Sequence, residues 1–106
     1  MARYLLKVSY TVEGARGLLS EGGSGRRTTV QRLIEGMGGT LEMFDFALGG
    51  DDAYVVADVP DLTDVAAVSL AVAAAGGARL TTVPLLTPAQ MDEAAKKQVT
   101  YRAPGG

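Results

Sequence analysis

The chain contains neither cysteine nor histidine. Without a thiolate it has no cysteine nucleophile, no thiolate-ligated zinc and no iron–sulfur cluster. Without an imidazole it has no Ser-His-Asp triad and no proximal histidine for haem. Any chemistry must come from tyrosine, arginine, lysine, carboxylate or hydroxyl side chains, from backbone groups, or from a borrowed cofactor. The sequence itself specifies no metal site and no cofactor.

Aromatic side chains are scarce as well: the chain has four tyrosines, two phenylalanines and no tryptophan. Because 47% of the 106 residues are hydrophobic, the core must be built from valine, leucine and alanine. A chain of this length forms one domain and buries roughly 60 to 65% of its unfolded surface, which favours pairing with a second copy. We expect a domain over residues 1–98 and a C-terminal tail over residues 99–106.

Neither a strong charge nor a long apolar run is present. The formal net charge is −2 and the ten basic residues are spread along the chain, unlike a surface that tracks nucleic-acid phosphates. The strand expected near residues 53–58 has one aromatic and no basic residue, unlike sheets that stack RNA bases. No apolar run approaches the ~20 residues of a membrane span, and residues 1–7 are too short and charged for a signal peptide. We expect a soluble, cytoplasmic protein without a nucleic-acid or membrane partner.

Hydrophobic periodicity predicts the order strand, helix, strand, strand, helix, strand. The expected strands span residues 3–11, 41–48, 53–59 and 79–86. The apolar stripes of the two long helices are Val30, Leu33, Ile34 and Met37 in the first, and Leu62, Val65, Val68 and Val72 in the second. A short helical piece over residues 13–20 precedes them, and an extra C-terminal helix runs through Lys97. This α+β order is that of the ferredoxin-like βαββαβ fold, an antiparallel four-stranded sheet with two helices on one face.

Particular residues mark where the helices begin and end. Ser24 is expected to be the N-cap of the first long helix, and the glycine pair at 38–39 to stop it. Asp61 or Thr63 can cap the second long helix. Thr87 is followed by a proline and, three residues after itself, by a glutamine, which predicts a strong start for the last helix.

The expected strands carry apolar residues on both faces. In the strand at 41–48, Leu41 and Met43 alternate with Phe44 and Phe46. Because the helices cover one face of the sheet, the other face must be covered too. We expect a second subunit to pack against it, sheet to sheet.

Several short motifs occur in an order typical of one family. They are Val8-Ser9-Tyr10-Thr11, Glu13-Gly14, Gly17-Leu18-Leu19, Glu21-Gly22-Gly23-Ser24-Gly25-Arg26-Arg27, Gly38-Gly39, Pro60-Asp61 and Pro84-Leu85-Leu86-Thr87-Pro88. Taken together, over residues 4–94, the chain resembles the GYD domain family. The resemblance implies the dimeric α/β-barrel group, in which two ferredoxin-like subunits pack their sheets into a barrel. Because that group includes monooxygenases, lactone isomerases, dehalogenases and polyketide cyclases, the resemblance implies a fold rather than one reaction.

The motif that names the family differs in this chain. Where the family shows glycine, a variable residue, tyrosine and aspartate, residues 49–52 are Gly-Gly-Asp-Asp, so Asp51 stands at the tyrosine position. If relatives use that phenol as an acid or a stacking surface, this protein either lacks that function or performs it with a carboxylate. Tyr54 is a candidate substitute, although its place in a strand predicts a different direction. Asp51 and Asp52 are catalytic candidates, the alternative being local hydrogen bonds within a turn.

The strongest candidate for a ligand site is the glycine-rich stretch at 22–27, where Ser24 and two guanidinium groups meet a helix start. Helix phase extends the apolar stripe through Arg26 and Arg27. This aims them at the cleft between helix and sheet, where they could hold a carboxylate, phosphate or enolate. The alternative is that they only form ion pairs, with Glu21, Asp45 or Asp52. Tyr10, which ends the first strand on its apolar face, would place a phenol in the same cleft, or serve only as a core residue.

These features favour a homodimeric small-molecule-binding domain with an anion or oxyanion site near the first long helix. One alternative is a cofactor-free isomerase, cyclase or monooxygenase, in which Tyr10, Asp51 or Asp52 transfers a proton. The other is a non-catalytic structural or regulatory assembly module. Whether the protein is an enzyme stays open on the sequence.

Overall fold

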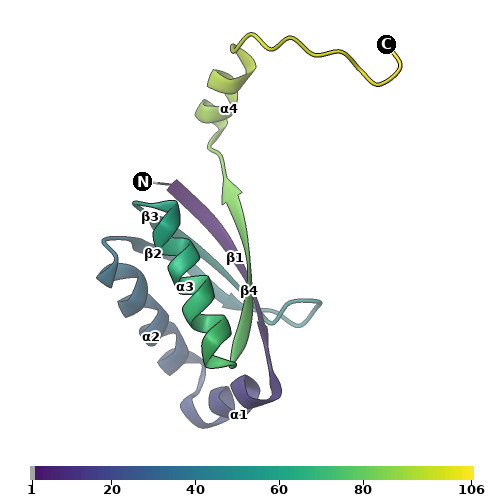
Figure 1. Ribbon diagram of the computed structural model, residues 1–106. Coiled ribbons are helices and arrows are strands. Elements are labelled where there is room, and N and C mark those ends of the chain that lie inside the picture. The colour runs from purple at the N-terminus through teal and green to yellow at the C-terminus, as the bar shows by residue number, and fades with distance from the viewer. Residues whose placement is uncertain (1) are drawn as a thin grey trace.

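The computed structural model describes residues 2–106. Its elements in chain order are β1 (Ala2–Tyr10), α1 (Val12–Glu21), α2 (Gly23–Gly36), β2 (Thr40–Phe46), β3 (Ala53–Val59), α3 (Leu62–Ala75), β4 (Ala78–Leu85) and α4 (Pro88–Ala95). The strands form one four-stranded sheet in the order β2-β3-β1-β4, and all neighbours are antiparallel. Helices α2 and α3 lie side by side on one face of this sheet (Figure 1). The predicted ferredoxin-like fold and its extra C-terminal helix are confirmed.

The core lies between the sheet and helices α2 and α3. On β1, Tyr4, Leu6 and Val8 are buried and alternate with half-buried residues. Strand β3 shows the same alternation along its whole length. From the helices, Ile34 and Val65 pack into this layer. Because β1 and β3 are the two central strands, their buried side chains hold the sheet and both helices together.

Leu62 was expected in the apolar stripe of α3, and this expectation is wrong. Its side chain is 59% exposed, whereas Val65 and Val68 are buried and Val72 is half-buried. At roughly 100° per residue, Leu62 lies about 90° around the helix from the centre of the three valines. The N-cap of α3 is Asp61, whose carboxylate accepts a hydrogen bond from the Thr63 backbone N–H at 3.1 Å.

The start of α2 also differs from the prediction that Ser24 caps it. Helix α1 ends and α2 begins at Gly22, whose positive φ of 83° turns the chain sharply. The Gly22 backbone N–H donates to the Leu18 carbonyl at 2.8 Å, and its own carbonyl accepts from the Arg26 N–H at 3.1 Å. Since one glycine ends the first helix and opens the second, Ser24 already lies in the first turn and its side chain forms no cap.

The face of the sheet opposite α2 and α3, which we call the open face, carries both charged and apolar side chains. The strand register places these half-buried apolar residues on it: Leu5, Met43, Val56, Val83 and Leu85. Arg3 forms an ion pair with Glu42 at its edge, with 2.7 Å between Nε and Oε2. The open face is therefore more apolar than a surface that contacts only solvent.

Helix α4 extends away from the sheet and from the other helices (Figure 1). Its start is fixed locally by a capping box, in which the Thr87 side chain and the Gln90 side chain each bond the other residue's backbone N–H. This confirms the predicted helix start. Among residues 2–106, no helix is long and apolar enough to cross a membrane.

Helix α1 is held against the turn between α3 and β4 by a close backbone approach. The Thr11 hydroxyl donates to the Gly76 carbonyl at 2.7 Å, and the Thr11 backbone N–H donates to the Gly77 carbonyl at 3.1 Å. A Cβ atom on residue 14 would overlap the Gly77 carbonyl oxygen. Only glycine lets the two segments come this close.

Glycine-to-alanine substitutions at two positions of α1 should therefore have opposite effects. We expect Gly14→Ala to lower the free energy of unfolding by about 2 kcal/mol or more, because its methyl group would displace the Gly77 backbone. Gly17→Ala is the matched control, since the space that its methyl group would enter is open to 4 Å. It should raise stability by about 0.5–1 kcal/mol through helix propensity. Urea unfolding measures both, and equal effects would contradict the packing described.

Candidate functional site

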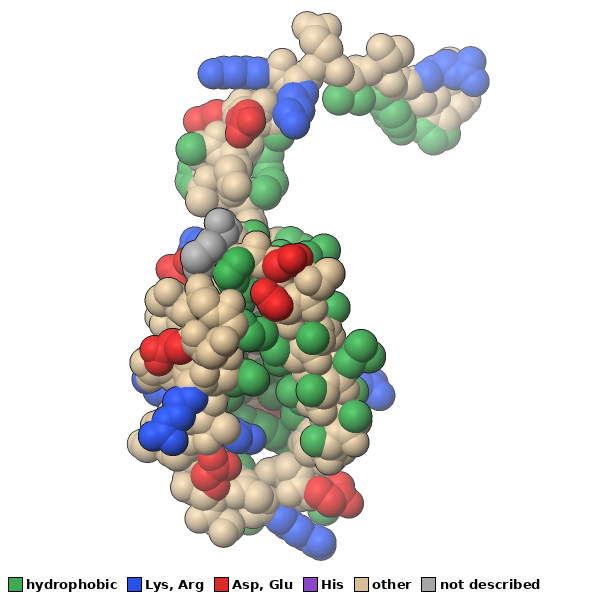
Figure 2. Space-filling model, turned by 60° about the vertical axis from the view of Figure 1, so that its left-hand side comes forward, with side chains coloured by type: hydrophobic (Ala, Val, Ile, Leu, Met, Phe, Trp, Pro, Cys, Tyr) green, Lys and Arg blue, Asp and Glu red, His purple; other side chains and the backbone are tan. Residues whose placement is uncertain are grey.

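A small apolar cavity lies between the helix-covered face of the sheet and helices α2 and α3. Its volume is about 90 Å³. All the layers contribute to its wall, which consists of Leu6, Val8, Tyr10, Arg26, Val30, Leu33, Ile34, Phe44, Val55, Val68, Val72, Ala78 and Leu80. Figure 2 shows the molecule hollowed on this side, with hydrophobic side chains lining the hollow. Only Tyr10 and Arg26 bring polar groups to a wall that is otherwise aliphatic or aromatic.

A second space, of about 210 Å³, lies beside the first and is bounded by α1. Tyr10, Arg26, Val72 and Ala78 line both spaces, so these residues form the boundary between them. The second space is more polar, because Glu21 also reaches it. The two spaces together form one site with an apolar inner part and a charged outer part.

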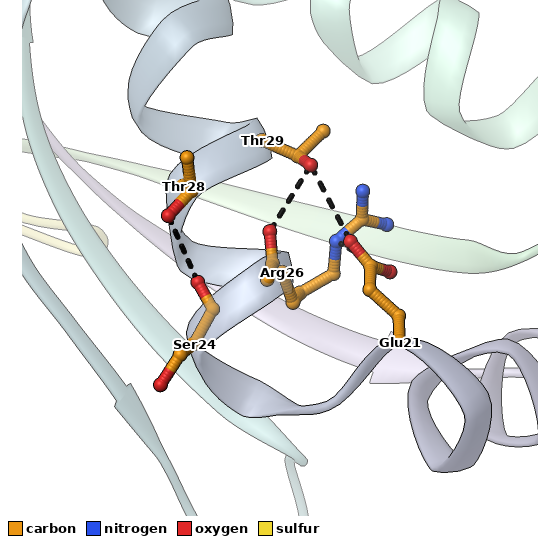
Figure 3. Close-up of polar contacts among 6 residues, drawn as sticks. Glu21, Ser24, Arg26, Thr28 and Thr29 are labelled. Atoms are coloured by element: carbon orange, nitrogen blue, oxygen red, sulfur yellow. Dashed lines mark hydrogen bonds and ion pairs between the residues drawn. The ribbon is translucent and has the colours of Figure 1, made fainter.

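Arg26 is held at this boundary by an ion pair that is not a hydrogen bond. Its Nε lies 3.6 Å from Glu21 Oε2, and the two side chains are 34% and 33% exposed (Figure 3). Nε is shielded from solvent, yet among residues 2–106 no acceptor lies within hydrogen-bonding geometry. The guanidinium therefore lies near a compensating charge while this buried N–H lacks an acceptor.

Glu21 is in turn placed by helix α2. The Thr29 hydroxyl lies 3.3 Å from Glu21 Oε1 and 3.1 Å from the Gly25 carbonyl, and it can donate its proton to either (Figure 3). Because Glu21 is the last residue of α1, this contact and the ion pair with Arg26 tie the two helices together across Gly22. The ion-pair alternative considered for Arg26 is thus realised with Glu21.

Arg27 and Ser24 do not reach the cavity. Arg27 is exposed, and its guanidinium donates to the Gln31 side-chain carbonyl one turn along the helix, at 2.8 Å. The expectation that both arginines extend the buried stripe is therefore wrong for Arg27, since adjacent residues on a helix point about 100° apart. Ser24 is exposed, and its backbone carbonyl accepts from the Thr28 hydroxyl at 3.0 Å (Figure 3).

Tyr10 supplies a half-buried phenol to both spaces. Burial is the main cause that raises its pKa above the ordinary value of 10.0. The positive charge of Arg26 opposes this rise, whereas the carboxylates of Asp52 and Glu21 add to it. The phenol is therefore protonated at neutral pH and is available as a hydrogen-bond donor.

The family model of the GYD domain matches residues 4–95. This chain belongs to the GYD domain family. Comparisons with curated proteins and with solved structures give no match. The GYD match covers the elements from β1 to α4, except for the first two residues of β1, and it includes all the residues that line the two spaces.

The two adjacent aspartates of the hairpin between β2 and β3 make different contacts. The Asp52 carboxylate accepts from the Tyr10 backbone N–H at 2.8 Å, and so holds the end of β1. Asp51 lies with the open-face residues Lys7 and Tyr54: its Oδ2 accepts from the Tyr54 hydroxyl at 3.2 Å and lies 3.8 Å from Lys7 Nζ. This hydrogen bond raises the pKa of Tyr54.

A phenol does lie beside Asp51, the residue that the resemblance places at the tyrosine position. Tyr54 was expected to point elsewhere, but its hydroxyl meets the Asp51 carboxylate. The register pairs Tyr54 with Lys7 on the open face, so the β-sheet separates this cluster from Arg26 and Tyr10. The catalytic candidates Asp51 and Tyr10 therefore lie on opposite sides of the sheet and do not form one site within this subunit.

The sequence did not predict all the residues that line the two spaces. Glu21 was considered only as an ion-pair partner, although it also lines the outer space. The contribution of Val72 and Leu80 to the cavity wall was not anticipated either. The spacing of Val68 and Val72 on one side of α3 indicates a buried face, but not that this face is incompletely filled.

Ultraviolet titration of the tyrosines tests the environment assigned to Tyr10. The difference between the native protein and Tyr10→Phe should give a midpoint above 10.0. Arg26→Met should move this midpoint still higher, because a positive charge near a phenol favours the phenolate. Arg27→Met is the control and should leave it unchanged. A midpoint at or below the ordinary value would show that the phenol is not shielded as described.

Proposed function

We propose that this GYD protein binds a small, mainly apolar molecule that carries one anionic group. The observation that supports this most directly is the position of Arg26, whose shielded Nε lacks an acceptor where the apolar cavity meets the charged outer space. In this proposal the apolar part of the ligand occupies the cavity and its anion contacts the guanidinium. Glu21 compensates the charge of Arg26 when the site is empty.

The chemistry of the site favours a carboxylate or an enolate. A guanidinium can donate two parallel hydrogen bonds to such a group, and the protonated phenol of Tyr10 offers a third donor. The cavity of about 90 Å³ has the volume of roughly three waters, so the apolar part of the ligand is short. Such a ligand pairs its anion with Arg26 in place of Glu21.

A catalytic version of the same site is a second candidate, and the place of the Tyr10 phenol at the same boundary as Arg26 favours it. A phenol that remains protonated beside a guanidinium can donate a proton to a developing enolate oxygen that Arg26 stabilises. This role suits an isomerase, a cyclase or a cofactor-free monooxygenase. If the cavity binds no small molecule, the assembly-module alternative is favoured instead.

We also propose that the protein is a homodimer joined through the open face. The apolar side chains Leu5, Val56 and Val83 are neighbours across three strands and are only half-buried. A second copy packed sheet to sheet would remove them from water, at roughly 25 cal/mol for each Å² of apolar surface. It would also enclose the cluster of Lys7, Asp51 and Tyr54.

Binding of hexanoate, followed by NMR chemical shifts, tests the role of Arg26. We expect Arg26→Met to weaken hexanoate binding by roughly ten- to a hundredfold, because a charge-assisted hydrogen bond contributes about 1.5–3 kcal/mol. Arg27→Met, a neighbouring loss of charge outside the cavity, should bind as the native protein does. Hexan-1-ol, which lacks the anion, should not distinguish the two variants. Equal weakening by both substitutions would contradict the proposal.

Sedimentation equilibrium tests the dimer. The native protein should be dimeric at micromolar concentration, and Val56→Lys should be monomeric because it places a charge in the apolar centre of the open face. Leu62→Lys alters a side chain that is 59% exposed on α3, away from the open face, and should remain dimeric. A monomeric native protein would refute the homodimer.

A further inference from the structure

The C-terminal arm, which we define as residues 86–106, has no buried residue; only its start lies near its own subunit, where Leu86, Thr87 and Gln90 line a hollow of about 140 Å³ with Arg3 and Asp58. Every residue of the arm is exposed, including all of α4 (Figures 1 and 2). The radius of gyration is 16.9 Å, against about 13 Å for a compact domain of this length. The longest dimension of the molecule is 56 Å, and the shortest is 24 Å. The arm accounts for this extended shape.

Helix α4 is too short to be stable without a packing partner. It has eight residues, whereas isolated helices shorter than about 12–15 residues are marginal in water. The arm nevertheless carries four large apolar side chains with exposed fractions of 56–81%, namely Leu86, Met91, Val99 and Tyr101. A well-capped helix flanked by such residues is typical of a segment that packs against another surface.

The local geometry directs the arm away from its own subunit. Only Leu86 and Thr87 connect β4 to α4. Thr87 is extended, with φ −74° and ψ 160°, as expected before a proline, and the capping box with Gln90 fixes the helix to it. With this connection, α4 points away from the sheet (Figure 1). In this orientation, a surface that receives α4 belongs to another molecule.

Charge favours another copy of this chain as that molecule. The arm has three basic residues, Lys96, Lys97 and Arg102, and two acidic ones, Asp92 and Glu93, whereas the whole chain has a net charge of −2. The remainder of the chain is therefore acidic overall. A segment that is basic and apolar is complementary to such a surface.

The open face offers the arm a matching surface. Glu42 and Asp58 lie on it near the end of β3, where burial and the neighbouring Glu42 carboxylate raise the pKa of Asp58, and Arg3 is the cation beside them. A further positive charge would stabilise this carboxylate pair. The arm itself begins next to Leu85, which belongs to the open face, so the two surfaces are continuous.

We propose that the C-terminal arm packs against a second copy of this chain. In the resulting dimer, the two arms are exchanged about a two-fold axis. Each arm buries the apolar side chains of α4 and the following segment on the partner, and brings its basic residues to the partner's acidic surface. Two identical exchanges then form in one dimer, as two-fold symmetry requires. This goes beyond a sheet-to-sheet contact, because it assigns a separate segment to the interface.

Photo-crosslinking can place the arm, because the chain has no cysteine and a single introduced one is labelled uniquely. Met91→Cys carrying a benzophenone maleimide should give a covalent product with the mass of two chains. Leu19→Cys, on the exposed side of α1, is the matched control and should stay at the mass of one chain. Crosslinks from Met91→Cys only within one chain would overturn the proposal.

Removing residues 87–106 gives an independent measurement. The dissociation constant of the dimer should rise by roughly a hundredfold, because several apolar side chains leave the interface. Hexanoate binding, which depends on Arg26, should be unchanged, so that loss of the arm and loss of the ligand site are distinguished. An unchanged dissociation constant would overturn the arm exchange while leaving the open-face dimer intact. A monomeric full chain, whose arm instead binds anionic lipid vesicles, would overturn it as well.

Discussion

Burial of the helix-side faces of β1 and β3 is the constraint on which the rest of the structure depends. Tyr4, Leu6 and Val8 can leave water only if α2 and α3 cover them, and this fixes the positions of both helices. The core is built mostly from valine, alanine and leucine. Small side chains between two helices and a twisted sheet do not fill all the space, and the apolar cavity is what remains.

Two close contacts of the backbone bring polar side chains to the boundary of this cavity. The turn at Gly22 joins α1 directly to α2, so that Glu21 and Arg26 meet although they belong to different helices. The contact of Gly14 with Gly77 holds α1 beside the start of β4. Tyr10 ends β1 at the same place. Three elements thus bring a guanidinium, a carboxylate and a phenol to one boundary of an otherwise apolar space.

The sheet separates two chemically different surfaces. On the helix side, the boundary formed by Tyr10 and Arg26 is suited to a small anion. On the open face, the hydrogen bond between Tyr54 and Asp51 lies among half-buried apolar residues, which suits an interface. In the hairpin between β2 and β3 the adjacent aspartates make different contacts, because Asp52 bonds to the end of β1 while Asp51 bonds to Tyr54 on the open face. The proposed ligand site and the proposed dimer contact therefore lie on different sides of one small domain.

The sequence alone determined the order of the elements and the cap at Thr87, and it narrowed the cap of α3 to Asp61 or Thr63. These depend on local periodicity and on hydrogen bonds within a few residues. Only the tertiary structure decided that Arg26 faces the cavity while Arg27 and Ser24 face solvent, because the turn at Gly22 sets the phase of α2. It also decided that α4 leaves the domain unpacked. Side-chain direction at a helix start and the fit between distant elements depend on the packing of the whole chain, which no local pattern records.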